Sequence, residues 1–291
     1  MASDPIFCHF VQELFPYSYE EASGSPQAFK EEFTPKGPLT KDLIELIASS
    51  FNVIEIVIQE IWSNYIGKNR RSMIQSAEFY VWHTISMCWM EEQIVTDIYD
   101  RFLSTIVLVR YVTEMIYCPT GKKFYKLTSR ILTVFFENSL REDFMKRGGW
   151  KRLGKHILNR KYHEYFNECA QYGFIIDFIP EDLKKKIRQS FSFITEISED
   201  IPNEWIDDLT HQVMWSAGTS VLNEINSPKI NKGKSVSKEA EGTSSKESNV
   251  LKDSDMPRSS EKQINLCVSH LNQLEEKLKE LISMFELLEA E

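Results

Sequence analysis

Residues 39–67 read LTKDLIELIASSFNVIEIVIQEIWSNYIG, and their apolar side chains recur in steps of three and four. The recurring positions are Leu43, Ile47, Phe51, Ile54, Ile58, Ile61 and Tyr65. Because about 3.6 residues make one helical turn, this spacing predicts a long amphipathic helix, which we expect to end at Gly67. The β-branched cluster at 53–58 favours a strand only locally, since the helical period continues on both sides of it. The fold is therefore expected to be built from helices.

The same period continues on both sides of this stretch. Asp4 followed by Pro5 is typical of a helix start. Ser72 with Gln75 forms a capping-box pair that we expect to open the helix after Gly67. The next apolar run, residues 94–112, is apolar on more than one side and should form a central helix ending before Pro119. No segment shows the alternation of a strand, so an all-α fold is predicted.

Five more helices are expected further along. One covers 127–135, and another covers 150–158 after a break at Gly148-Gly149. A third covers 162–172 and is closed by Gly173 in the position of a C-terminal cap. Two further starts carry a proline with acidic residues in the first turn, at Pro180 and at Pro202. A helix dipole favours negative charge at that end.

Composition limits the classes of protein to consider. A formal net charge of −9 argues against a general nucleic-acid binder, although a local basic patch is compatible with it. No run of about 18 apolar residues is present, so no membrane span is predicted. The amino terminus lacks the pattern of a secretory signal. The five cysteines are widely spaced and read as structural thiols of a reducing compartment. We expect an intracellular protein, cytoplasmic or nuclear.

Four parts follow along the chain. Residues 1–38 hold the first helix and a proline-rich irregular segment packed on the core. Residues 39–226 form the helical domain. Residues 227–262 are rich in Ser, Lys and Glu without any aromatic residue, and are expected to be a disordered linker. Residues 263–291 form the last part, a predicted coiled coil.

The coiled coil is predicted from a seam of apolar residues through four heptads. A helix with so narrow an apolar stripe must bury it against another helix, in a second copy of the chain or in a helical partner. The alternative is that this helix folds back on the chain's own domain. The predicted interface residues are Ile264, Cys267, Leu271, Leu274, Leu278, Leu281, Phe285 and Leu288.

Residues 135–153 read FFENSLREDFMKRGGWKRL. A helix end, a charged turn, an aromatic residue, a glycine pair and a helix with inward Leu153 and Ile157 follow one another there. This order resembles the junction inside an armadillo-type helical repeat, over about residues 135–158. No period near 40 residues continues the pattern. The resemblance implies a scaffold, armadillo- or HEAT-like, that binds peptides or helices along a groove.

A cluster of basic residues overlaps this junction. In an acidic chain it is a candidate surface for an acidic peptide, a phosphate or a nucleic acid, or simply a solvated helix face. A second group, Lys184, Lys185, Lys186 and Arg188, follows later in the chain. The residues of the first cluster are Lys146, Arg147, Lys151, Arg152, Lys155, Arg160 and Lys161.

Catalytic signatures are not recognised. Thr120-Gly121-Lys122-Lys123 lacks the upstream glycine and the following hydroxyl of a phosphate loop. His156, His163 and Cys169 match no standard zinc module, so neither a metal ion nor a cofactor is expected. We interpret the chain as a non-catalytic adaptor or scaffold that binds proteins and forms a homo-oligomer or a hetero-coiled coil. The alternatives are a nucleic-acid-associated helical protein and an enzyme with an unrecognised motif.

Overall fold

The computed structural model describes residues 3–15, 34–191 and 202–226, which belong to one compact unit. Within these ranges the fold is all-helical and contains no strand, only an isolated bridge between Lys36 and Leu39. The all-α prediction is confirmed for this part of the chain. The predicted linker 227–262, the predicted coiled coil 263–291 with all its interface residues, and most of the proline-rich segment lie outside the described residues.

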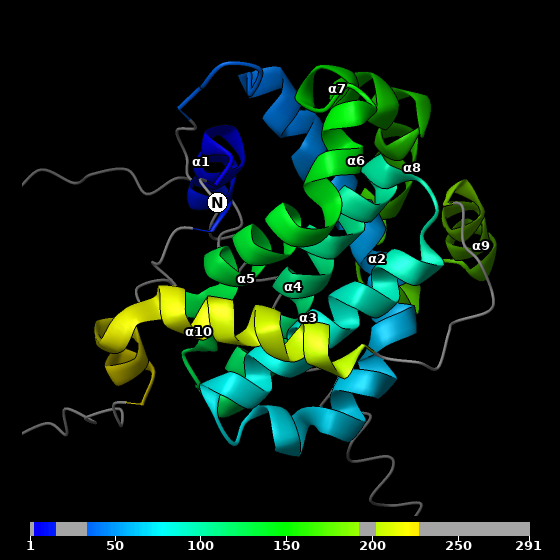
Figure 1. The fold of residues 1–291 in the computed structure, drawn as a ribbon. Helices are drawn as coiled ribbons and strands as arrows, with labels where there is room; N and C mark the ends of the chain where they lie inside the picture. The colour runs from blue at the N-terminus through cyan, green and yellow to red at the C-terminus, as the bar shows by residue number, and fades with distance from the viewer. Residues whose placement is uncertain (1–2, 16–33, 192–201, 227–291) are drawn as a thin grey trace, which may run out of the picture. The chain divides into compact units, whose positions relative to one another are not determined.

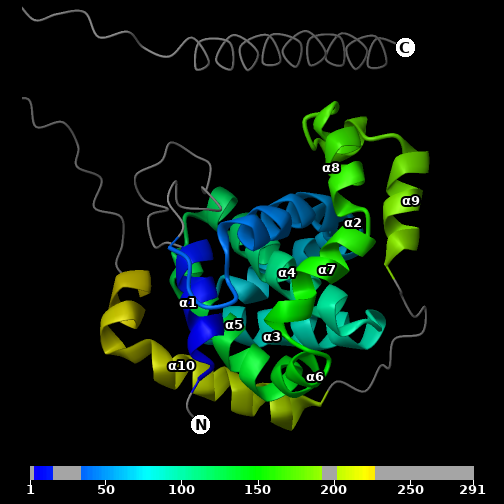
Figure 2. The ribbon, with the colours of Figure 1, turned by 90° about the horizontal axis from the view of Figure 1, so that it is seen from above.

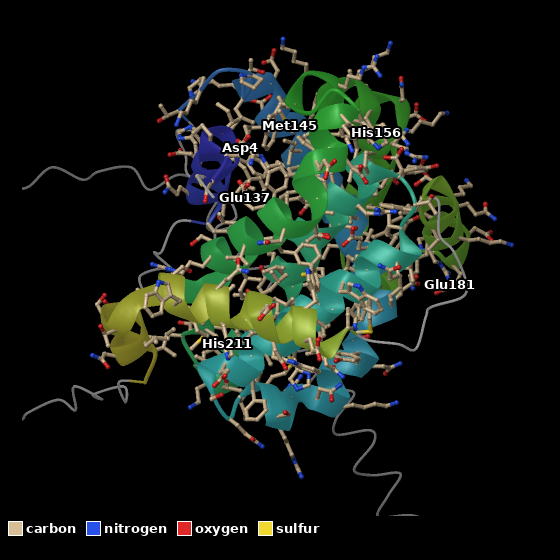
Figure 3. All side chains as sticks on the ribbon, in the orientation of Figure 1. Asp4, Glu137, Met145, His156, Glu181 and His211 are labelled. Carbon is tan, nitrogen blue, oxygen red and sulfur yellow. The ribbon has the colours of Figure 1, made fainter. Side chains whose placement is uncertain are left out.

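Helix α1 (Pro5–Leu14) begins as predicted. The Asp4 carboxylate accepts hydrogen bonds from the backbone N–H groups of Ile6 and Phe7 at 2.9 and 2.8 Å, and Pro5 occupies the first helical position. The backbone N–H of Asp4 itself donates to Glu137 Oε1 at 2.5 Å, and Figure 3 shows the two labelled residues close together. Capping and this contact together fasten α1 to the core.

Helix α2 (Lys41–Met73) is longer than predicted. Gly67 does not end it: the glycine is exposed and helical, and no atom lies within 4 Å of where its Cβ would be. The apolar face continues past it through Ile66 and Met73, both fully buried. Burial of that face outweighs the cost of about 1 kcal/mol of one glycine inside a helix. The expected stop at Gly67 was therefore wrong.

The start of α3 (Ala77–Ile94) was also misplaced. Ser72, predicted to cap it, lies inside α2, and the cap is Ser76, whose hydroxyl accepts from the Phe79 N–H at 3.1 Å. The helix expected to run without interruption from Ile94 is also divided. The structure has a break between Ile94, where α3 ends, and the start of α4 (Ile98–Thr120). Asp97 caps α4 by accepting from the N–H groups of Tyr99 and Asp100.

Helix α4 occupies the centre, as its apolar pattern predicted. It packs against α2, α3 and α5 (Thr128–Phe135), and Figure 2 shows it in the middle of the helices. Among the described residues it is the single helix that is long and apolar enough to cross a membrane. However, 67% of its most apolar stretch is buried inside the fold, as in the core helix of a folded domain. The expected end before Pro119 was wrong: the helix continues to Thr120, and Gly121, with φ +65°, is its C-terminal cap. A proline in the last turn removes only one helical hydrogen bond.

The segment after α4 bends repeatedly around an aromatic core. The 3-10 turn η1 (Phe124–Leu127) leads into α5, then the π-helical turn η2 (Phe136–Leu140) and α6 (Arg141–Lys146). The rings that meet there come from four helices and the π turn, with neighbouring centroids 4.0 to 6.3 Å apart. They are Phe7, Phe10, Phe102, Phe136, Phe144 and Trp150.

The predicted break at Gly148-Gly149 is confirmed. Both glycines have positive φ, +106° and +54°, a backbone that side chains rarely allow. Helix α7 (Trp150–Asn159) follows and buries Leu153 and Ile157, as the junction predicted. The local geometry of the junction is therefore as expected.

The remaining helices are close to the predicted ones. Helix α8 (Tyr162–Ala170) is followed by Gly173 with φ +62°, then the 3-10 turn η3 (Ile176–Phe178) and α9 (Glu181–Ser190). Helix α10 (Asn203–Asn226) contains a kink at Gly218, where the backbone is not helical. Figures 1 and 2 show α10 along α3 and α5, while α7, α8 and α9 pack on α2.

Candidate functional site

The basic cluster expected around residues 146–161 is only partly free to bind an acidic partner, because several of its side chains form ion pairs within the protein. Arg160 forms an ion pair with Asp100, Lys146 with Glu142, and Lys161 with Glu164. Arg147 lines a polar recess of about 340 Å³ together with two aspartates and a second arginine. In the second group Lys184 pairs with Glu181, and Arg188 pairs with Glu60 and Glu181.

Three cations of the cluster share one exposed face of α7. Lys155 stands four residues after Lys151 and three after Arg152, and no ion pair joins these three cations to any residue in the described ranges. The structure therefore reduces the predicted seven-residue patch to a short basic face.

A charged cluster that the sequence did not suggest lies beneath α7. Asp100, fully buried on α4, accepts a hydrogen bond at Oδ1 from Tyr162 at 3.0 Å, and the same oxygen lies 2.7 Å from His156 Nε2. Its Oδ2 lies 2.5 Å from an Arg160 nitrogen. Burial and the neighbouring Asp100 carboxylate raise the pKa of Tyr162 well above its ordinary value, so the phenol remains a proton donor. A buried carboxylate is tolerated when it is paired in this way.

This cluster is also the one place in the described chain where three metal-type ligands meet. Asp97, Asp100 and His156 present ligand atoms within 4.8 Å of one another. The Arg160 guanidinium already neutralises Asp100, and a cation placed there would be repelled by it. Of the residues considered for zinc in the sequence, His163 is exposed, and Cys169 is buried with its thiol pKa raised to about 11 by desolvation. We assign the cluster a structural role that joins α4 to α7 and α8.

A concave surface lies between α3 and α10. We call it the α3–α10 groove, and its cavity measures about 510 Å³, within the range of ligand sites. Helix α3 contributes Glu78, Phe79, Trp82 and His83, which share a helix face at steps of three and four. The residues that line it are Ser72, Glu78, Phe79, Trp82, His83, Asp207, Thr210 and His211.

Packing of α10 on α3 positions the two walls. Ile206, Leu209 and Val213 are buried against the core, which turns Asp207, Thr210 and His211 toward α3. The Trp82 indole N–H donates to Asp207 Oδ1 at 2.9 Å and joins the walls across 125 residues of sequence. Figure 3 shows the labelled His211 on this part of α10.

His83 is held at the inner end of the groove. Burial lowers the pKa of its imidazole, which keeps the ring neutral near pH 7. Its Nε2 lies 3.0 Å from Ser72 Oγ, and its Nδ1 lies 3.4 Å from the hydroxyl of Tyr65. A serine beside a histidine suggests a nucleophile and a base, but the third group is a phenol with a pKa raised by burial. That phenol cannot stabilise an imidazolium as a carboxylate does, so we assign the set to positioning the ring.

Thr210 completes the floor of the groove. The residue is only 2% exposed, yet its hydroxyl oxygen has no hydrogen-bond partner among the described residues. A buried polar group without a partner is costly and uncommon in folded proteins. Thr210 therefore carries a buried hydroxyl beneath the groove whose hydrogen-bonding capacity is not used by any described residue.

None of these groove residues was singled out from the sequence as functional. Phe79 is 49% exposed and Trp215, two turns beyond Asp207 on α10, is 91% exposed. Both aromatic residues lie outside the apolar stripes that the sequence predicted for their helices. An aromatic side chain in that position is the sequence signal that would have pointed to the groove. The pairing of α3 with α10 carries no sequence signal, because it joins segments more than 120 residues apart.

Comparison with known proteins adds no assignment to this geometry. No protein-family model matches the chain, and searches of curated proteins and of solved structures also find no match. The groove combines aromatic side chains, two carboxylates and two imidazoles, and burial lowers the pKa of one of these imidazoles, His83.

Proposed function

We propose that this protein is a non-catalytic adaptor whose helical domain binds a segment of another protein in the α3–α10 groove. Residues 263–291 serve assembly in this proposal, as a coiled coil with a second copy of the chain or with a helical partner. The armadillo-like order of residues 135–158 agrees with a helical scaffold of this kind. No cofactor or metal ion takes part in the proposed function, and the proposed site of action is the cytoplasm or nucleus.

The observation that carries the proposal is the exposed aromatic edge of the groove. Asp207, His211 and Trp215 are spaced by four residues and therefore share one face of α10. That face extends the groove toward Trp215, whose side chain is almost fully exposed. Tryptophan is enriched among the residues that contribute most to protein–protein binding. A segment lying along this face of α10 would cover Trp215 and lead into the groove that Phe79 lines.

A peptide selection on the full chain tests the groove without assuming a partner. Peptides selected from a random displayed library are labelled, and their affinity is measured by fluorescence anisotropy. Phe79→Ala and Trp215→Ala are each expected to weaken binding at least tenfold. Phe178→Ala, which removes another exposed aromatic in η3, is the matched control and should leave affinity unchanged. Selection of no peptide, or equal binding by all three variants, would refute the groove as the binding surface.

The basic face of α7 supports the second candidate function, association with nucleic acid. Lys151, Arg152 and Lys155 are exposed and unpaired within the described part of the chain. Retention on RNA or DNA that falls with salt and is lost in the Lys151→Glu/Arg152→Glu variant would support it. Retention that the variant does not change would exclude this face as the contact.

A further inference from the structure

We propose that the α3–α10 groove recognises a basic peptide by enclosing an arginine or lysine side chain between its aromatic walls and its two carboxylates. This inference rests on the proposed function, because it names the chemistry of the partner segment. The geometry that supports it is the meeting of Phe79 and Trp82 with Glu78 and Asp207 around one cavity.

The charges of the lining favour a cation. Glu78 and Asp207 are both exposed carboxylates, and no lysine or arginine belongs to the residues that line the cavity. Arg70 and Arg71 precede Ser72 in the last turns of α2 but do not line the groove. The imidazole of His83 is held neutral by burial, so it does not oppose a positive guest. A cationic side chain therefore meets two carboxylates without competition from a fixed positive charge in the lining.

The aromatic walls suit the same guest. A guanidinium or ammonium group is attracted to the face of an aromatic ring, and tryptophan is the strongest of these partners. Trp82 is held by its hydrogen bond to Asp207 and by the edge-on His83 ring, whose centroid is 5.2 Å away at 90°. The ring is therefore fixed before any ligand arrives, which lowers the ordering cost of binding.

Hydrogen-bonding capacity also remains for a cationic donor. Asp207 accepts one bond, from Trp82, among the described residues, whereas an ionised carboxylate has about four acceptor sites. An arginine presents five donors in a planar fork, so it can donate to the carboxylate oxygens of Asp207 and Glu78 at several points. The cavity of about 510 Å³ accommodates the head group together with its aliphatic stem.

The experiment uses two labelled peptides of equal length, one alternating arginine with serine and the other alternating glutamate with serine. Their affinities for the full chain are measured by fluorescence anisotropy at low and high salt. The test variant is Glu78→Gln/Asp207→Asn, in which the new amide at the second position keeps an oxygen for the Trp82 N–H. The matched control is Glu45→Gln/Asp182→Asn, which removes the same two charges from exposed positions on α2 and α9. Thermal unfolding of both variants verifies that they fold.

The proposal expects the arginine peptide to bind and the glutamate peptide not to bind. Affinity should fall at least tenfold in Glu78→Gln/Asp207→Asn and less than twofold in the control. Equal losses in the two variants would overturn it, because they would indicate general attraction to an acidic chain. Absence of arginine-peptide binding would also overturn it. Library peptides that bind through Phe79 and Trp215 but are not basic would refute this inference alone, while failure to select any peptide would refute the proposed function.

Discussion

Asp100 on α4 and His156 on α7 lie 2.7 Å apart, Oδ1 to Nε2, beneath the surface of the helical domain. Tyr162 and Arg160 approach the same carboxylate, so one buried aspartate joins α4 to the segment that carries α7 and α8. Removing one member of a buried charge network leaves the others without compensation.

The first prediction concerns this aspartate. Asp100→Ala should lower the free energy of unfolding by about 3 kcal/mol, since it deprives a histidine, an arginine and a tyrosine of one shared acceptor. Urea unfolding followed by circular dichroism measures the change. Asp143→Ala, an exposed aspartate on α6, is the control and should alter stability by less than about 0.5 kcal/mol. A loss below about 1 kcal/mol in Asp100→Ala would contradict the structural role of the cluster.

The second prediction concerns pH. Burial raises the pKa of Glu91 to about 7, although Trp62 donates a hydrogen bond to it at 2.8 Å. In the unfolded chain this carboxyl titrates near 4.5. Between these values the folded state keeps a proton that the unfolded state has lost, so the contribution of Glu91 to stability falls as pH rises from about 4.5 to 7.

Glu91→Gln should remove that dependence. The stability of the variant relative to the natural chain is expected to improve by about 3 kcal/mol between about pH 4.5 and pH 8, from roughly 1.36 kcal/mol per pKa unit. Urea unfolding at several pH values measures both proteins. Parallel pH profiles would show that Glu91 does not titrate in this range.

The third prediction compares two glycines. Gly149 has φ +54° and ψ −142°, a region that side chains almost never adopt, and an added Cβ would lie 3.0 Å from Met145 Sδ. Gly149→Ala should therefore cost about 1–3 kcal/mol of stability. Gly67 lies in a helix with open space around it, so Gly67→Ala should stabilise the protein by about 0.5–1 kcal/mol. Thermal and urea unfolding measure the change in stability of each variant. If both variants were stabilised or both destabilised, the roles assigned to the two glycines would be wrong.

The fourth prediction concerns assembly. Leu274→Pro/Leu278→Pro in the full chain should abolish self-association or partner binding through 263–291, because proline breaks a helix at two seam positions. Light scattering gives the mass of the natural chain and the variant, and circular dichroism verifies that the domain stays folded. Unchanged association of the double variant would refute the coiled-coil prediction.

Sequence patterns located the helices better than their ends. The run from Leu43 to Tyr65 identified α2, and Gly148-Gly149 identified the sharp bend before α7. The stop expected at Gly67 failed because burial of Ile66 and Met73 carries the helix beyond it. The cap expected at Ser72 failed for the same reason, and Ser76 took that role.

The candidate site was not predictable from the same patterns. The groove depends on Trp82 meeting Asp207, and the charged cluster depends on Asp100 meeting His156 and Tyr162. Each contact joins helices through packing in three dimensions. The basic residues that were predicted as a patch were partly separated when Arg160 turned inward to Asp100.

By itself the sequence determined the helical class of the described domain, its central helix and its glycine bend. These features follow from local causes: a period of about 3.6 residues, the apolar content of one segment, and the backbone freedom of glycine. Only the tertiary structure decided which polar side chains are buried, which cations are neutralised, and that α3 and α10 enclose a groove. Those outcomes depend on contacts between segments that are distant in the sequence. When the apolar faces of these segments pack, they bring together polar groups whose positions in the sequence show no regular spacing.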